Sequence, residues 1–178
     1  MRLRSPSLRD LYAVRAGGSD PEAQRWLQWP DAHLVPAGQR ERLLTVLPGG
    51  GGWPASHWEP HVVNLVAVDP VAGRLAGLVS ANRETSEIGG WLVPEYRGRG
   101  LGVVLFAAGA ELAHRHLGVA VVRAGAHPGN SASIGALTAA GFSPAAGPGT
   151  HVQPNGQVIP ARWFDHRCGE PGYCGSGR

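Results

Sequence analysis

Apolar residues gather in four short stretches of this chain, separated by polar or glycine-rich segments. The stretches 61–69, 73–82, 86–94 and 119–126 are rich in Val, Leu and Ala. Short apolar runs of this length, bounded by turn residues, are typical of buried strands. The turn residues at 69–73 predict that the first two stretches form a hairpin.

Helices are predicted where apolar residues recur every three or four positions. In 100–117 the residues Leu101, Leu105 and Leu112 fall on one helical face. Asp20 followed by proline, and Asn130 before a run of small residues, are typical N-caps. The predicted helices are residues 8–17, 20–29, 36–47, 100–117 and 130–142.

The order of these segments predicts the fold class. Residues 1–7 form a short first strand, and the Gln-Pro-Asn-Gly turn at 153–156 predicts a closing hairpin between 149–152 and 157–166. We expect an α/β fold with a mixed, mostly antiparallel sheet of six to seven strands, flanked by helices. Residues 1–167 would form one domain, and 168–178 a glycine-rich tail.

Composition excludes several classes of protein. The formal net charge of +3 is too small to indicate nucleic-acid or membrane-surface binding. No stretch approaches about 20 consecutive apolar residues, and the N-terminus lacks a signal-peptide core, so the cytoplasm is expected, with a monomer or homodimer. The spacing of Cys168 and Cys174 matches no zinc motif. We expect no metal site and two reduced thiols.

Glycine and arginine are concentrated at 97–102, between a predicted strand and a predicted helix. Gly98, Gly100 and Gly102 leave the backbone accessible, and a helix N-terminus attracts anions. Arg97 and Arg99 could add charge-assisted hydrogen bonds to a phosphate. A purely structural turn is the alternative interpretation.

Two common phosphate-binding motifs do not fit this turn. A Walker loop requires lysine, and the chain contains none. A dinucleotide fingerprint that starts at Gly98 would need a third glycine at Val103. What remains is the pattern Arg-x-x-Gly-x-Gly at a junction between a strand and a helix.

This pattern resembles the acyl-CoA pyrophosphate loop of the GNAT superfamily of N-acetyltransferases. The segment "EIGGWLVPEYRGRGLG" (87–102) and the segment "HPGNSASIGALTAAGF" (127–142) are similar to its Rim-type branch, the ribosomal-protein N-terminal acetyltransferases and their relatives. The N-terminal strand and helices also resemble that branch, so the likeness covers most of residues 1–166.

The resemblance implies that acetyl-CoA, or another short acyl-CoA, is the cofactor and that a primary amine is the acceptor. A bulge at Gly89-Gly90 would splay the fourth strand from the fifth; a simple twist is the alternative. Pantetheine would then pair with the fourth strand. The residues expected to bind the cofactor are Trp91, Leu92, Val93, Arg97, Gly98, Arg99, Gly100, Leu101, Gly102, Asn130 and Ser133.

The resemblance also implies catalytic roles. Glu87 corresponds to a proposed base of the Rim-type branch; a solvated or arginine-paired carboxylate is the alternative. The position of the family's tyrosine acid is Leu137, so Ser133 is the candidate proton donor, unless it is an ordinary first-turn serine. Asn130 could hold pantetheine or order that donor.

The acceptor side is less defined by sequence. The segment 48–61, with two tryptophans and two histidines, could frame an amine or form a surface flap. His127 and His151 are either bases or structural residues, and Trp26 and Trp29 are either a wall of the cleft or core. The acceptor could be a protein N-terminus or a small molecule, as in a tailoring or resistance enzyme. A non-catalytic acyl-CoA-binding module is the third alternative.

Overall fold

The computed structural model describes residues 1–45 and 61–169. Most of the segment 48–61 and most of the tail therefore lie outside the described residues, as does Cys174. Cys168 is disulfide-bonded, so the expectation of a reduced thiol at this position is wrong.

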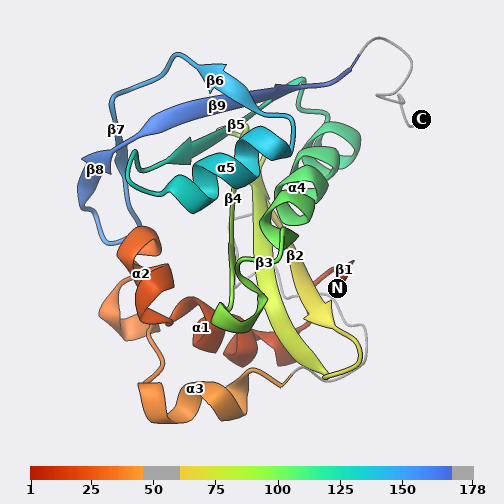
Figure 1. The fold of residues 1–178 in the computed structure, drawn as a ribbon, viewed down its shortest axis with the longest axis vertical. Coiled ribbons are helices and arrows are strands. Elements are labelled where there is room, and N and C mark those ends of the chain that lie inside the picture. The colour runs from red at the N-terminus through yellow and green to blue at the C-terminus, as the bar shows by residue number, and fades with distance from the viewer. Residues whose placement is uncertain (46–60, 170–178) are drawn as a thin grey trace.

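A seven-stranded sheet runs through the molecule in the order β1-β2-β3-β4-β5-β9-β6 (Figure 1). Every neighbouring pair is antiparallel except β4 and β5, which are parallel. This confirms the expected mixed, mostly antiparallel sheet. The strands are β1 (Arg2–Arg4), β2 (Val62–Asp69), β3 (Arg74–Asn82), β4 (Glu87–Leu92), β5 (Val121–Ala126), β6 (Ser143–Ala145) and β9 (Arg162–Arg167).

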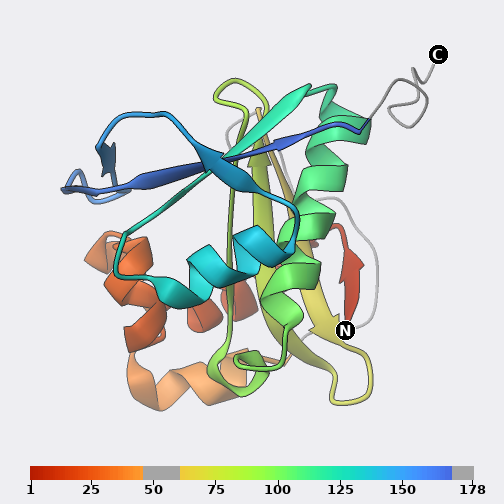
Figure 2. The ribbon, with the colours of Figure 1, turned by 45° about the horizontal axis from the view of Figure 1, so that its top comes forward.

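Helices cover both faces of the sheet, as Figures 1 and 2 show. Adjacent residues of β3 point to opposite faces: Leu78 packs in the cluster with α1, whereas Val79 packs with Leu105 of α4. Burial on both faces explains why β3 reads as an unbroken apolar run. The helices are α1 (Leu11–Gly18), α2 (Pro21–Leu27), α3 (Ala37–Leu43), α4 (Leu101–Leu117) and α5 (Ser131–Ala139).

The strands β4 and β5 separate almost as soon as they meet. Their ladder has a single pair, Glu87 with Arg123, whereas β4 pairs with β3 over its whole length, from Gly77–Leu92 to Asn82–Glu87. The expected splay is therefore present.

The expected bulge at Gly89-Gly90 is not present, because the register between β3 and β4 is unbroken there. Gly90 serves a different purpose. A Cβ at this position would lie 2.9 Å from the Leu78 carbonyl oxygen and 3.2 Å from Leu105 Cδ2. The glycine therefore allows close packing of β3, β4 and α4.

The C-terminal segment is divided differently from the sequence prediction. The expected hairpin forms between β7 (Thr150–Val152) and β8 (Val158–Pro160), but β8 ends at proline and β9 then joins the main sheet. Residues 157–166 are thus two strands in two sheets. β6, with the sequence Ser-Pro-Ala, was not predicted.

No helix within residues 1–45 and 61–169 is both long and apolar enough to cross a membrane.

Candidate functional site

The glycine–arginine turn forms an open end of helix α4. Gly98 and Gly100 have φ angles of 69° and 73°, and a Cβ at either position would meet no atom within 4 Å. Backbone conformation, not lack of space, therefore requires glycine here. Gly100 caps the helix without a side-chain hydrogen bond. The N–H groups of residues 98–102 donate to no described residue, which leaves a cluster of donors at the positive end of a 17-residue helix.

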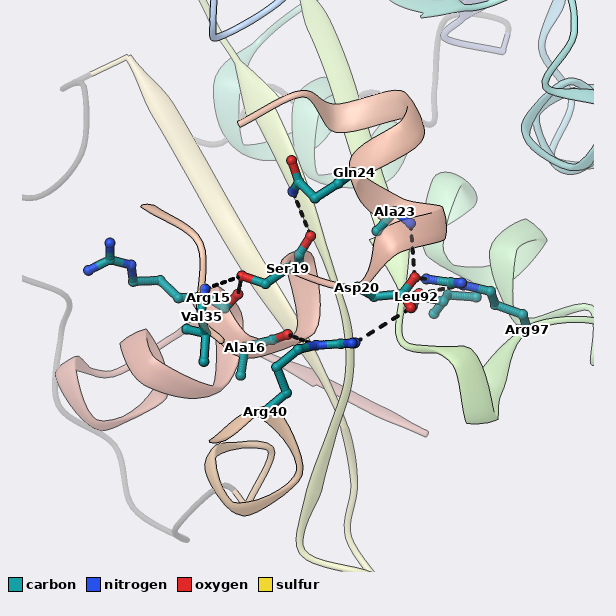
Figure 3. A network of polar contacts seen from close by, with 11 residues as sticks. Arg15, Ala16, Ser19, Asp20, Ala23, Gln24, Val35, Arg40, Leu92 and Arg97 are labelled. Carbon is teal, nitrogen blue, oxygen red and sulfur yellow. Dashed lines mark hydrogen bonds and ion pairs between the residues drawn. The ribbon is translucent and has the colours of Figure 1, made fainter. Parts of the chain in front are cut away.

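Arg97 holds this turn in place rather than pointing freely toward a ligand. Its Nη2 donates to Asp20 Oδ2 at 2.5 Å, and its Nε donates to the Leu92 carbonyl oxygen at 2.8 Å (Figure 3). Its charge is thus already compensated by Asp20. Arg99 is exposed, and its guanidinium lies 5.8 Å from the centre of the Tyr96 ring.

Asp20 joins three elements through one buried carboxylate. It accepts a hydrogen bond from Ala23 N at 2.9 Å as the N-cap of α2, pairs with Arg97, and lies 3.5 Å from Arg40 of α3 (Figure 3). Burial alone would raise the pKa of Asp20, but the hydrogen bonds from Arg97 and Ala23 and the charges of Arg97 and Arg40 outweigh it and lower the pKa. The carboxylate therefore stays ionised. The sequence had identified it only as a helix cap.

A cavity of about 510 Å³ lies between the turn, β4, α2 and the start of α5. Eight of the expected cofactor-binding residues line it: Trp91, Leu92, Arg97, Gly98, Gly100, Gly102, Asn130 and Ser133. Three others do not. Val93 is only 1% exposed and belongs to the core under α1, while Arg99 and Leu101 lie beside the cavity in sequence without lining it.

A second cavity, of about 410 Å³, opens on the other side of the separating strands. Glu87 lines it, together with His127, His151, Trp26 and Trp29. The two cavities share a wall made of Trp26, Leu27, Gly90, Phe106, Asn130 and Ser133. Molecules that occupy the two cavities would therefore meet at this wall.

Glu87 is half-buried at the first position of β4. Its strand neighbour Arg123 pairs with Asp165, at 3.1 Å. No described residue forms a hydrogen bond or an ion pair with the Glu87 carboxylate. The alternative of an arginine-paired carboxylate is therefore not what the structure has.

Asn130 and Ser133 are brought together by the start of α5. Asn130 Oδ1 accepts a hydrogen bond from Ser133 N at 3.0 Å, as expected for an N-cap. The Ser133 hydroxyl donates to none of the residues that the structure describes. Both residues reach the shared wall, whereas Leu137, at the tyrosine position, is 1% exposed and lines only the second cavity.

In the hairpin β7–β8, only His151 was considered in the sequence as a possible site residue. Its residues His151, Gln153, Pro154 and Ile159 line the second cavity, and Asn155 Nδ2 lies 3.5 Å from Gln28 Oε1, just after α2. A hairpin signal was visible in the sequence, but nothing in it indicated contact with α2, which is more than a hundred residues earlier. Within the described residues, no group of three or more His, Cys, Asp or Glu side chains could hold a metal ion.

Comparison of the whole chain with solved structures gives matches of low sequence identity and similar fold. The ribosomal-protein-S5-alanine acetyltransferase from Vibrio fischeri is 18% identical, with 93% of this chain and 91% of that chain covered and a TM-score of 0.66. The aminoglycoside acetyltransferase AAC(6')-Ib in complex with coenzyme A is 20% identical, covers 93% of each chain and has a TM-score of 0.66.

Another match is the spermidine N-acetyltransferase from Vibrio cholerae in complex with CoA and spermine, at 15% identity, with 93% of this chain and 94% of that chain covered and a TM-score of 0.67. A comparison with curated proteins finds no significant match. Residues 1–143 match the family model described as acetyltransferase (GNAT) domain, so this chain belongs to the GNAT acetyltransferase family.

Proposed function

We propose that this protein transfers an acetyl group from acetyl-CoA to a primary amine by direct attack in a ternary complex. One observation carries the proposal: two cavities meet at the wall of Gly90, Asn130 and Ser133, where β4 separates from β5. The first cavity offers anion-binding backbone groups, and the second offers the Glu87 carboxylate, which pairs with none of the described residues. Residues 1–167 would act as one catalytic domain.

The donor side of the reaction depends on backbone groups. The N–H groups of residues 98–102 would bind the CoA diphosphate, since they have no partner among the described residues and lie at a helix N-terminus. The edge of β4 from Gly90 to Leu92 lines the first cavity and carries no ladder to β5. Pantetheine could therefore form hydrogen bonds with this edge, and a β4 N–H could polarise the thioester carbonyl.

On the acceptor side, Glu87 takes a proton from the ammonium group, directly or through water. The free amine nitrogen then attacks the thioester carbon, a C–N bond forms and the C–S bond breaks. The attacking nitrogen then loses a second proton, and the Ser133 hydroxyl passes a proton to the departing thiolate and regains one from the nitrogen through water, so that the sulfur leaves as the CoA thiol. Asn130 positions Ser133 through the hydrogen bond to its backbone N–H. Much of the acceleration would come from the alignment of the two substrates.

We place the chain in the Rim-type branch of the family, on the basis of Glu87, Asn130 and Ser133. Solved structures of similar fold include acetyltransferases named for ribosomal proteins, aminoglycosides and spermidine, so the acceptor has to be inferred from the chain's own residues. We expect the protein to act in the cytoplasm.

The test combines calorimetry with CoA and an assay of thiol release from acetyl-CoA in the presence of amines. The variant Gly100→Ala should weaken CoA binding at least about tenfold, because the loss of one or two hydrogen bonds to a charged group costs about 1.5–3 kcal/mol. Gly73→Ala is the matched control. Gly73 has a φ of 62° and equally open surroundings, but it lies in the β2–β3 turn.

Both variants should lose similar stability, and only Gly100→Ala should lose CoA affinity. Absence of CoA binding by the unmodified protein, or equal affinity losses in the two variants, would contradict the proposal.

A further inference from the structure

The second cavity contains very little charge. Glu87 is the one carboxylate among the described residues that line it, and no arginine is present. Two carboxylates in neighbouring segments are already engaged: Glu22 accepts from Trp26 Nε1 at 3.1 Å, and Glu84 lies 2.9 Å from His61 Nε2. The remaining polar groups of the cavity are hydroxyls, amides and the two imidazoles.

His127 does not add a second base. Its Nδ1 accepts a hydrogen bond from Gly129 N at 3.0 Å. In the neutral ring the proton is therefore on Nε2, which is a donor and not an acceptor. Protonation of this ring would add positive charge to the cavity and repel a second ammonium group.

The rest of the described cavity surface is apolar and includes three large aromatic side chains, Trp26, Trp29 and Phe106. Trp26 and His127 form a pair with ring centres 5.4 Å apart, and Trp29, Phe106 and Ile88 contribute further apolar surface. Flat rings that line a cavity bind flat apolar groups by stacking and by burial of area.

From this arrangement we infer that the acceptor is an amine with a single positive charge, joined to a flat apolar body such as an aromatic ring. The inference rests on the proposed function, because it assigns the second cavity to the acceptor. One ammonium group matches the one carboxylate. Each additional ammonium group would lose hydration in a cavity whose described lining offers no second carboxylate, which is strongly unfavourable.

This inference separates the protein from acetyltransferases that act on polycations. A polyamine or an aminoglycoside carries several ammonium groups, and their capture requires several acidic side chains. The aromatic amine could be a free arylalkylamine or the N-terminus of a peptide that begins with an aromatic residue. Both sources present one ammonium group close to an aromatic ring, and they differ in size.

The experiment measures kcat/KM with acetyl-CoA for 2-phenylethylamine, tryptamine, propylamine, spermidine, kanamycin and a short peptide with N-terminal Phe. The inference expects at least one aromatic monoamine, free or peptidic, to exceed spermidine and kanamycin by about tenfold or more. Comparison of the free amines with the peptide identifies the source.

Two substitutions test the reasons for this preference. Thr85 is exposed at the rim of the cavity, so Thr85→Glu adds a second carboxylate and Thr85→Gln is its uncharged control. The Glu variant should raise the ratio of spermidine to phenylethylamine turnover about threefold, and the Gln variant should leave it unchanged. Trp26→Ala should lower the ratio of phenylethylamine to propylamine turnover about fivefold. Each test compares two amines on the same variant, so a change in the affinity of that variant for CoA affects both turnover rates and cancels in their ratio.

A preference for spermidine or kanamycin would overturn the inference and leave the proposed function intact. Turnover ratios that respond to neither substitution would also overturn the inference and leave the proposed function intact. Absence of CoA binding, or of thiol release with every amine, would instead overturn the proposed function.

Discussion

Replacement of Asp20 by Asn tests whether one buried carboxylate couples the stability of the fold to the turn at 97–102 that lines the first cavity. Asn keeps the N-cap acceptor for Ala23 N but removes the charge that pairs with Arg97 and Arg40. Arg97 would then be free to leave the position that holds the turn at 97–102. We therefore expect effects on both stability and CoA binding.

The magnitude follows from the contacts. A hydrogen bond between charged groups contributes about 1.5–3 kcal/mol. The Arg97 side chain is 31% exposed and can regain hydration, so the lower part of this range applies. We expect Asp20→Asn to reduce the free energy of unfolding by about 1.5–2 kcal/mol, and Asp20→Ala to remove about 1 kcal/mol more because the cap is lost as well.

The pH dependence has a defined direction. The pKa of Asp20 is lowered in the folded state, so its contribution to stability is complete above the ordinary carboxyl pKa of about 4 and is lost as the pH falls below it. The stability difference between the unmodified protein and Asp20→Asn should therefore shrink in acid. Denaturant unfolding followed by tryptophan fluorescence at several pH values measures this difference.

The control is Asp10→Asn. Asp10 is also buried and paired with an arginine, Arg4, at 2.7 Å, but Arg4 lines neither cavity, whereas Arg97 lines the first. Both variants should lose stability, whereas only Asp20→Asn should weaken CoA binding, by about three- to tenfold, a loss equivalent to about 0.7–1.4 kcal/mol. Equal CoA affinity in the two variants, measured by calorimetry, would refute the coupling.

Three further predictions concern the site and its frame. Glu87→Gln should lower kcat about 10²-fold and leave the Kd of CoA unchanged, as steady-state kinetics and calorimetry would show; full activity would exclude Glu87 as the base. Ser133→Ala should lower kcat about tenfold in the same kinetic assay. The control is Ser131→Ala, which should leave kcat unchanged because Ser131 lines the first cavity only. Equal kcat values for the two variants would exclude Ser133 from the mechanism. Gly90→Ala should reduce the free energy of unfolding by about 1–3 kcal/mol, because its Cβ would lie 2.9 Å from a carbonyl oxygen. Gly89→Ala should leave this free energy unchanged, because a Cβ there would meet no atom within 4 Å. Denaturant unfolding of the two variants measures the difference.

Local signals in the sequence were sufficient to predict most of the helices and strands that surround the site. Asp20 and Asn130 cap their helices as predicted, because an N-cap depends on a few consecutive residues. The glycines at 98 and 100 leave the backbone of the turn accessible, as expected, since a Cβ at either position would meet no atom within 4 Å. The long apolar runs are buried strands.

Predictions failed where distant segments decide the structure. Arg97 lines the first cavity as expected, but its pairing with Asp20, 77 residues away in sequence, was not predicted. No local pattern marks such a partner. The strand β6 contains proline and lies at the sheet edge, so its sequence carries no strand periodicity. The split between β8 and β9 likewise depends on which sheet each strand joins.

The separation of β4 from β5 also bears on the lifetime of the protein in the cell. Beyond Glu87, the side of β4 that faces β5 has no partner strand, so the unliganded enzyme carries an internal sheet edge. A ligand that occupies this edge adds about 2.7 kcal/mol of stability when its concentration is 100 times its Kd. Starvation for the acyl donor would thus shorten the half-life of the enzyme as well as stop its turnover.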